Sequence, residues 1–288
     1  MKKTLLLISS AVLSSAALAN YNAFTFSDYS SSYSDSEAGV ISGGSFYAGY
    51  YSVNGFNVST PGLIAKDNVY FTNGHVGNGV SAGGIYLDAV SNTGGESSSN
   101  NIDFASMEAF YRTMSDNLAS QTATGSVTAQ PWGQLIFQSN STDSKHVFNL
   151  DSALMQGVNQ ITFMGLNQGD ELVINFTGTG SMLLSNLDLS YSLGSYKTVL
   201  NMPSLSSLTI ESTSPWASIL APNATILGSN GYIQGSLVAN SFSSRVQLHY
   251  DPNAYFAINT MPIPEPSTWA LMGLGLVGIA VLSRKKAK

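Results

Sequence analysis

The chain has 288 residues, no cysteine and only 10% charged residues, and between Asn20 and Ile263 its 16 acidic and five basic residues give a net charge of −11. This charge argues against a nucleic-acid or anionic-membrane partner, because both need a basic patch. Without cysteine, neither disulfides nor thiolate metal ligands can hold the chain together, so its fold depends on burial alone.

The first residues have the pattern of a secretory signal peptide. Lys2 and Lys3 form a charged start, and a short apolar stretch follows from Leu5 to Leu13. Ala17 and Ala19 then form a small-residue cleavage site, so Asn20 is expected to begin the mature chain. We therefore predict a signal peptide over residues 1–19.

Residues 20–258 are predicted to form one large β domain. Two regions, 38–90 and 216–250, consist of short β-branched or aromatic pieces bounded by Gly, Asn or Ser. The expected strands lie at 39–44, 63–67, 69–71, 84–87, 217–223, 224–226, 232–239 and 246–248. Pieces of three to six residues cannot bury a face as one hairpin, whereas rungs of a parallel β-helix share one core of small inward residues. An antiparallel β-sandwich is the alternative.

One amphipathic helix is expected at about 103–119, between the two regions. Its apolar residues recur at three- and four-residue steps, and Asn101 or Asp103 can cap its first turn. The stripe consists of Phe104, Met107, Phe110 or Tyr111, Met114 and Leu118. We expect this stripe to pack along the β core. Strands resume after Gly125, for example at 134–137 and 171–176.

The candidate chemistry of the domain is sparse. His75, His146 and His249 form no metal or catalytic motif, so each is expected at the surface or in a turn. Two acidic groups are weak candidates for Ca²⁺, although neither has the spacing of a known calcium loop. They are Asp28, Asp35 and Glu37 in one group, and Asp170 and Glu171 in the other. Five tyrosines are candidates for stacking on sugars, namely Tyr29, Tyr33, Tyr47, Tyr50 and Tyr51.

Residues 259–288 have the three parts of a temporary membrane anchor. Pro264-Glu265-Pro266 holds the chain extended, because each proline fixes φ and removes a backbone donor. The uncharged stretch that follows can form a helix in lipid, although its 14 residues are short of the ~20 that span comfortably. Its membrane-facing residues are expected to be Trp269, Leu271, Leu274, Leu276, Val277, Ile279 and Leu282. Arg284, Lys285 and Lys286 then keep the end in the cytoplasm. A buried core helix is the alternative.

This tail resembles the PEP-CTERM sorting signal of Gram-negative bacteria. The match runs over about residues 262–286, with the Pro-Glu-Pro box, a Gly-rich apolar helix and a basic end in register. The resemblance implies recognition of Pro264, Glu265 and Pro266 by an exosortase, a membrane transpeptidase, followed by release to the cell surface or extracellular matrix. Some proteins with this tail bind ice, which is an association of sorting.

The domain resembles a second family, the choice-of-anchor A type of bacterial adhesive domain, over about residues 21–250. The segments that carry the resemblance are 22–26, 38–44, 102–105, 200–203, 218–225 and 235–239. Their order is more specific than any one of them. The chain departs from the family at Ala38, where an acidic residue is expected before Gly39.

These patterns predict an exported, non-enzymatic protein of the surface or matrix, without a cofactor. Its expected partners are an exosortase, the secretion machinery, the inner membrane transiently and an extracellular polysaccharide. Ice binding is one alternative, although no repeated Thr-x-Thr ladder occurs in the chain. A glycan hydrolase, which needs two carboxylates in one cleft, is a second alternative.

Overall fold

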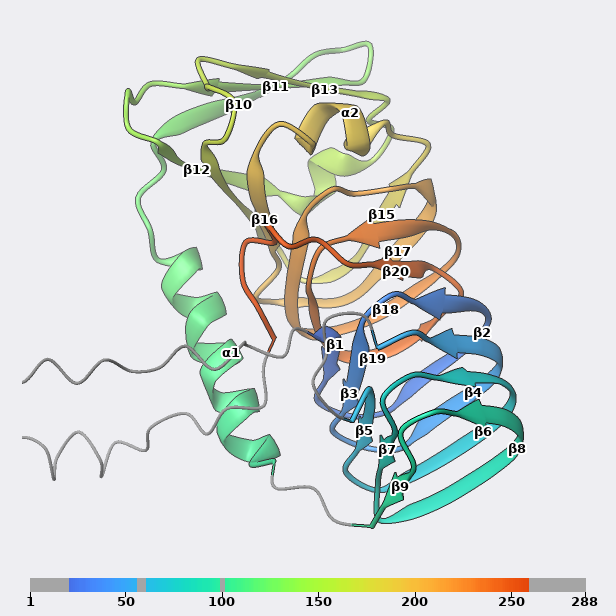
Figure 1. Ribbon diagram of the computed structural model, residues 1–288. Helices are drawn as coiled ribbons and strands as arrows, with labels where there is room; N and C mark the ends of the chain where they lie inside the picture. Colours follow the sequence, from blue (N-terminus) through green and yellow to red (C-terminus); the bar gives the residue numbers. More distant parts are fainter. Residues whose placement is uncertain (1–20, 56–60, 99–101, 259–288) are drawn as a thin grey trace, which may run out of the picture.

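The computed structural model describes residues 21–55, 61–98 and 102–258, which form a stack of β-strands flanked by one long helix (Figure 1). The body is a single 17-stranded sheet, and every pairing between its strands is parallel. This confirms the predicted β-helix-like solenoid and excludes the antiparallel sandwich. Each winding of the chain is called a rung below.

The N-terminal rungs combine a short and a long strand. The short strands are β1 (Tyr21–Thr25), β3 (Gly39–Ser42), β5 (Leu63–Ala65), β7 (Val80–Ser81) and β9 (Glu96–Ser97). The long strands are β2 (Tyr29–Ser36), β4 (Phe46–Val53), β6 (Asn68–Val76) and β8 (Gly84–Asn92). Each long strand contains one left-handed residue, with φ between 51° and 54°, at Tyr33, Tyr50, Asn73 or Ala89. Ladder pairing skips these residues, so each long strand serves two faces of the solenoid.

The C-terminal rungs are built from the remaining strands of the large sheet. They are β12 (Lys145–Asp151), β14 (Glu171–Thr177), β15 (Gly180–Ser185), β16 (Lys197–Asn201), β17 (Leu205–Thr213), β18 (Ser218–Gln234), β19 (Leu237–Ser244) and β20 (Gln247–His249). Several strands are longer than the expected three to six residues, and β18 has 17. The pairing of β18 skips residues between Ala221 and Thr225 and again between Gly228 and Gly231, so this one strand continues around two corners.

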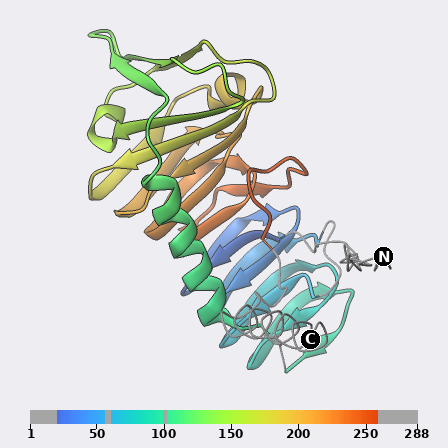
Figure 2. The ribbon, with the colours of Figure 1, turned by 90° about the vertical axis from the view of Figure 1, so that its left-hand side faces the viewer.

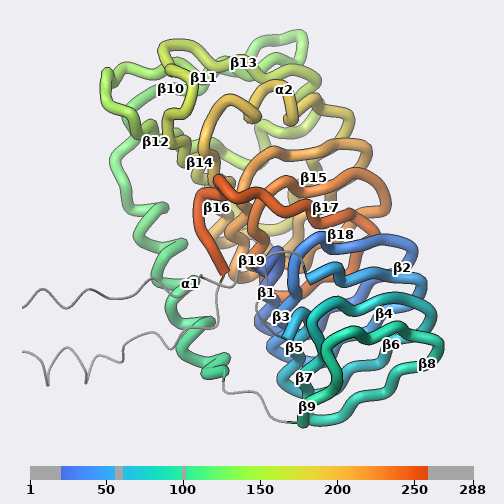
Figure 3. Tube along the Cα trace, viewed as in Figure 1, coloured from blue at the N-terminus to red at the C-terminus, as the bar shows by residue number. Residues whose placement is uncertain are grey.

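The two sets of rungs meet in the middle of the stack. The chain winds from the middle to one end, returns along the outside as the helix α1, and winds back from the other end (Figures 1 and 3). At the junction β19 pairs with both β1 and β2, for example at Ala23–Leu237 and Tyr29–Phe242. One hydrophobic interior therefore joins segments more than 200 residues apart.

A small sheet covers the C-terminal end of the stack. It contains β10 (Gly125–Ala129), β11 (Gln134–Ser139) and β13 (Gln160–Met164), with β10 antiparallel to β11. The short helix α2 (Leu189–Leu193) lies beside β13, and the 3₁₀-helix η1 (Ser152–Met155) contacts β12 and β15. Such a cap is expected, because the last rung of a solenoid otherwise exposes its interior.

Large side chains fill the interior, contrary to the small inward residues that the sequence suggested. Tyr29 stacks between Phe46 at 5.2 Å and Phe242 at 4.5 Å, and all three are buried. The hydroxyls of Tyr29 and Tyr51 bond to each other at 2.7 Å, and burial raises the pKa of both. Aromatic rings on successive rungs stack well, so they suit a solenoid interior as well as small residues do.

The helix α1 (Phe104–Ala119) confirms the predicted helix. Asp103 caps it by accepting a hydrogen bond from the backbone N–H of Ser106 at 3.0 Å. Met107, Tyr111 and Leu118 are buried, whereas Phe110 is exposed. The buried side chains pack on the outer face of the short-strand sheet, as expected, along much of its length (Figure 2).

An asparagine ladder, formed by Asn149, Asn175 and Asn201 on β12, β14 and β16, ties α1 to this face. The amide of Asn201 donates to Asn175 Oδ1 at 2.8 Å, and the amide of Asn175 donates to Asn149 Oδ1 at 3.1 Å. Asn201 also exchanges hydrogen bonds with Ser115 of α1, at 2.6 and 2.9 Å. The amide of Asn175 reaches the carbonyl of Leu118 at 2.9 Å, so the ladder satisfies polar groups that α1 buries.

Several predicted features lie outside the described residues. These are the signal peptide with Ala17, Ala19 and Asn20, the Pro-Glu-Pro box, the apolar stretch 269–282 and the basic tip. In the ranges that the structure describes, no helix is long and apolar enough to cross a membrane.

Candidate functional site

A ladder of exposed tyrosine rings runs along one face of the N-terminal rungs. Tyr47, Tyr70 and Tyr86, called the tyrosine ladder below, occupy the same register position on β4, β6 and β8. Their rings stack at centroid distances of 5.3 and 5.0 Å with interplanar angles of 8° and 4°. These distances follow from the ~4.8 Å spacing of paired strands. The three side chains are 40%, 41% and 57% exposed, so their outer faces and edges meet solvent.

A second pair of stacked rings lies at the bends of β2 and β4. Tyr33 and Tyr50 stack at 4.9 Å and 7°, and both are more than half exposed. Both have φ of 53°, a left-handed conformation that costs a bulky residue about 1–2 kcal/mol. The same conformation recurs at Asn73 and Ala89, so it belongs to the bend, and the exposed stacked rings are what distinguish Tyr33 and Tyr50. The guanidinium of Arg245 lies over the Tyr33 ring, 5.6 Å from its centroid.

A hollow of about 550 Å³, called the serine hollow below, lies next to both groups of rings. Hydroxyl and aromatic side chains from five strands or their ends line it. The lining residues are Ser30, Ser31, Ser32, Tyr47, Ala48, Gly49, Tyr70, Thr72, Gly228, Ser229, Ser243, Ser244 and Arg245. Among these described lining residues, Arg245 alone is charged. The hollow is thus lined by aromatic rings, by serine and threonine hydroxyls, and by the guanidinium of Arg245.

This arrangement has the chemistry of a carbohydrate site. The stacked tyrosine rings present a continuous row of apolar edges to solvent, against which the C–H surfaces of a sugar ring can pack. Serine hydroxyls both donate and accept hydrogen bonds, as sugar hydroxyls do. Ser30, Ser32 and Ser243 make no side-chain hydrogen bond within the described residues, so their hydroxyls are available to a ligand.

A second aromatic hollow, of about 660 Å³, lies between β13 and α2. Tyr191 is 87% exposed there, and Trp216 packs against the backbone of Gly194. The indole N–H of Trp216 donates to Tyr232 at 2.9 Å, which fixes the ring. This hollow lacks the aligned rings of the first, so it is the weaker candidate.

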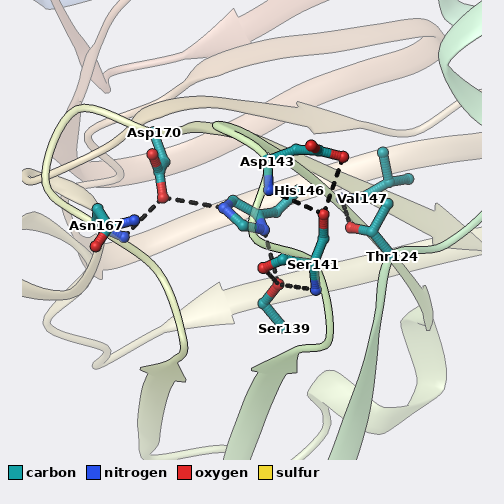
Figure 4. A network of polar contacts seen from close by, with 8 residues as sticks. All are labelled: Thr124, Ser139, Ser141, Asp143, His146, Val147, Asn167 and Asp170. Atoms are coloured by element: carbon teal, nitrogen blue, oxygen red, sulfur yellow. Dashed lines mark hydrogen bonds and ion pairs between the residues drawn. The ribbon is translucent and has the colours of Figure 1, made fainter.

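A buried polar cluster corrects one sequence-based expectation. His146 was expected at the surface, but it is 1% exposed and lies between Ser139 and Asp170 (Figure 4). Ser139 Oγ is 2.7 Å from His146 Nδ1, and His146 Nε2 is 2.9 Å from Asp170 Oδ2. The backbone N–H of Asn167 at 2.6 Å and the adjacent imidazole hold the pKa of Asp170 below its usual value. His75 and His249 are partly exposed, as expected.

Ser139, His146 and Asp170 are linked in the same way as a nucleophile, its general base and an orienting carboxylate. Their burial instead indicates a structural role. All three residues are buried, so a substrate cannot reach the hydroxyl. Ser139 Oγ also accepts the backbone N–H of Ser141 at 3.1 Å. The cluster therefore fastens the loops before β12 and β14 below the capping sheet.

The acidic candidates do not gather into a metal site. Asp28 accepts a hydrogen bond from the backbone N–H of Ser45, and Glu37 accepts one from Tyr250, both at 2.8 Å. Asp35 lies on β2, and burial raises its pKa. Within residues 21–55, 61–98 and 102–258, no three His, Asp or Glu side chains come close enough to hold a metal ion. The calcium hypothesis gains no support from this part of the chain.

The structure divides the five tyrosines that were candidates for sugar stacking by their exposure. Tyr33, Tyr47 and Tyr50 are exposed, whereas Tyr29 and Tyr51 belong to the core. Tyr70, Tyr86 and Arg245 were not predicted. A repeated apolar–Tyr–apolar pattern could have revealed the ladder, since it recurs at 46–48, 69–71 and 85–87.

Two models of known protein families match the chain. A family model described as a putative ice-binding-like adhesive domain matches residues 14–250, which include every strand described above. A second model, a PEP-CTERM protein-sorting motif, matches residues 262–285. No curated protein and no solved structure matches the chain. Both resemblances expected from the sequence are confirmed.

Proposed function

We propose that this chain, which belongs to the ice-binding-like adhesive domain family, is a surface adhesin that binds polysaccharide through the tyrosine ladder and the serine hollow. The observation that carries the proposal is the row of three parallel, exposed rings at a constant spacing. Rigid aromatic side chains lose little conformational entropy on binding. A row of them suits a polymer, which presents similar faces at regular intervals.

The sorting motif implies processing by an exosortase and export to the cell envelope or surface. Our proposal adds that Pro264, Glu265 and Pro266 are the residues recognised, and that the stretch from Trp269 to Leu282 crosses the inner membrane only transiently. The extracellular matrix of a Gram-negative cell is the proposed destination. Intact mass in strains with and without the exosortase tests this route. An unchanged tail in both strains would contradict it.

Non-enzymatic binding without a cofactor is part of the proposal. It is supported by the lining of the serine hollow, where the described residues include no carboxylate. Glycoside cleavage generally needs two carboxylates that flank the scissile bond. Incubation of the chain with the bound polysaccharide, followed by an assay for new reducing ends, tests this part.

Ice binding is the alternative function, and one observation favours it. Hydroxyls align in pairs across β15, β17, β18 and β19, with Ser207 to Ser181 and Thr225 to Ser241 both at 2.8 Å. These hydroxyls bond to each other, however, and the apolar residues Leu183 and Leu227 follow them on the strands. Thermal hysteresis of a concentrated solution distinguishes ice binding from adhesion.

The adhesion test is affinity electrophoresis of the full-length chain, in mild detergent, through gels that contain polysaccharide. Replacing Tyr47, Tyr70 and Tyr86 together with alanine should abolish retardation, because loss of central aromatic contacts commonly lowers affinity more than tenfold. Phe110→Ala is the matched control, since this aromatic ring is exposed but lies on α1, away from the ladder and from both hollows. Equal retardation of the triple variant and the unaltered chain would refute the proposed site.

A further inference from the structure

The charge in the serine hollow differs from that of the domain as a whole. The domain carries 16 acidic residues and five basic ones, yet the one charged residue among those that line the hollow is Arg245. Two carboxylates lie beside lining residues without lining the hollow themselves: Glu211 accepts the hydroxyl of Ser229 at 2.8 Å, and Asp88 pairs in register with Thr72. Arg245 therefore supplies the one charge among the residues that line the hollow.

The guanidinium of Arg245 makes no ion pair or hydrogen bond with the described residues, in contrast to that of Arg112. Arg112 pairs with Glu108 at 2.9 Å and donates to Asn223 at 2.7 Å. Arg245 is exposed and has no carboxylate within 4.0 Å in the part of the chain that the structure describes. Its guanidinium rests on Tyr33, a contact that orients the group without using its N–H donors.

The position of Arg245 is fixed by its backbone. Its backbone N–H donates to the carbonyl of Gly228 at 3.0 Å, and the neighbouring Ser244 hydroxyl donates to the same carbonyl at 3.0 Å. Ser31 donates to the carbonyl of Ser244 at 2.7 Å. These bonds join the end of β19 to β2 and β18, so the guanidinium is presented from a rigid edge of the hollow.

We infer that the serine hollow selects an acidic polysaccharide, with Arg245 pairing to the carboxylate of a uronic acid unit whose ring lies against the exposed edges of Tyr47 and Tyr70. This inference rests on the proposed function and specifies its ligand. A guanidinium can bind a carboxylate through two parallel N–H···O bonds, which neutral sugar hydroxyls cannot match. Ser30, Ser32 and Ser243 then serve the ring hydroxyls of the same unit.

The surrounding negative charge adds selectivity rather than preventing binding. Charges farther away than about 8 Å are largely screened at physiological salt. At shorter range, acidic residues elsewhere on the surface repel the same polymer. We consequently expect an acidic polysaccharide to bind this protein at the serine hollow and in few other places.

A matched pair of polymers tests the inference: polygalacturonate and its methyl ester, which have the same backbone and differ in charge. The full-length chain should bind the acid form about tenfold more tightly, the factor that one charge-assisted bond provides. Arg245→Gln should weaken binding of the acid form alone, so that the two polymers become equal. Arg245→Lys should keep part of the preference, and Lys66→Gln, a change at an exposed cation outside the hollow, should keep all of it.

The outcomes separate this inference from the proposed function. Failure to bind polygalacturonate, equal binding of both polymers, or an unchanged preference in Arg245→Gln overturns the acidic-ligand inference. If the ladder variant of Tyr47, Tyr70 and Tyr86 still loses retardation in gels of neutral polysaccharide, the adhesive function stands without that inference. If the ladder variant loses nothing, the proposed function fails as well.

Discussion

The asparagine ladder and the tyrosine ladder are the same device in two environments. Each places one residue type at the same register position on three successive strands. Asn175 and Asn201 are buried beneath α1, and their amides are used in hydrogen bonds to each other and to the helix. The tyrosine rings contact each other as well, but their outer sides remain exposed.

The two ladders differ in role because α1 covers the asparagines and no described element covers the tyrosines. A solenoid aligns any residue that recurs once per rung, because parallel strands pair in register. Where α1 lies over such a column, buried polar groups must be satisfied and the column is structural. Where no element covers it, the aligned groups are free to meet a ligand. The following changes test this division by stability on one side and binding on the other.

The largest expected effect is on stability, from Asn201→Ala. This change removes the hydrogen-bond partners of Asn175, of the Ser115 hydroxyl and of the Ser115 carbonyl. Buried groups left without partners should lower the free energy of unfolding by about 3 kcal/mol. Urea denaturation of the full-length chain measures this loss. Retardation by polysaccharide should not change at native conditions.

Asn149→Ala is the matched control for the asparagine ladder. Asn149 is exposed, and Asn175 keeps its bond to Leu118 when this neighbour is lost. The expected cost is only about 0.5 kcal/mol. Equal losses for Asn201 and Asn149 would show that the position beneath α1 does not matter.

Much of this architecture could be predicted from the sequence. Short β-branched pieces bounded by Gly, Asn or Ser indicated the rungs, and the three- and four-residue steps after Asp103 indicated α1. The asparagine ladder was not predicted, although its members recur every 26 residues. That interval becomes meaningful only when the length of a rung is known, and rung length varies along this chain.

The second effect concerns Tyr50 and Tyr51, neighbours in sequence that point to opposite sides. The hydroxyl of Tyr51 bonds to that of Tyr29 in the interior, so Tyr51→Phe leaves a buried hydroxyl without a partner. We expect a loss of about 2 kcal/mol in unfolding free energy. Tyr50→Phe removes an exposed hydroxyl and should cost almost nothing. A large loss of unfolding free energy in Tyr50→Phe would mean that the stacked pair of Tyr33 and Tyr50 is structural.

The third effect depends on pH and concerns Asp170. Its pKa is held below 3.8 in the folded chain, chiefly by the N–H of Asn167, so the ionised form stabilises the fold. That contribution is present above the unfolded pKa of about 3.9 and is lost as the pH falls through the lower folded value. Asp170→Asn should therefore be less stable than the unaltered chain at neutral pH, and the difference should shrink as the pH falls below the unfolded pKa.

Urea midpoints across this pH range measure the difference. A constant difference between Asp170→Asn and the unaltered chain would contradict the assignment. Polysaccharide binding at neutral pH should be the same in both, because the cluster lies under the capping sheet and the tyrosine ladder lies on the N-terminal rungs.

The candidate site was harder to predict than the fold. Tyr33, Tyr47 and Tyr50 were proposed for sugars together with Tyr29 and Tyr51, because sequence alternation alone does not show which side faces the core. The left-handed residue at each bend shifts that alternation by one position. Such residues are usually Gly or Asn, so a tyrosine gives no sequence signal of a bend. Arg245 reaches the hollow only because β19 pairs with β2 across the junction.

The smallest expected effect comes from Tyr50→Asn and separates strain from function most directly. Asn73 occupies the equivalent bend on β6, where asparagine adopts the same left-handed conformation at little cost. Relief of strain should offset the lost stacking on Tyr33, so unfolding free energy should change by less than about 0.5 kcal/mol. Binding of polygalacturonate should weaken about threefold, because Tyr33 and with it Arg245 lose their support. If the variant is destabilised but binds normally, the stacked pair of Tyr33 and Tyr50 is part of the scaffold, like the asparagine ladder.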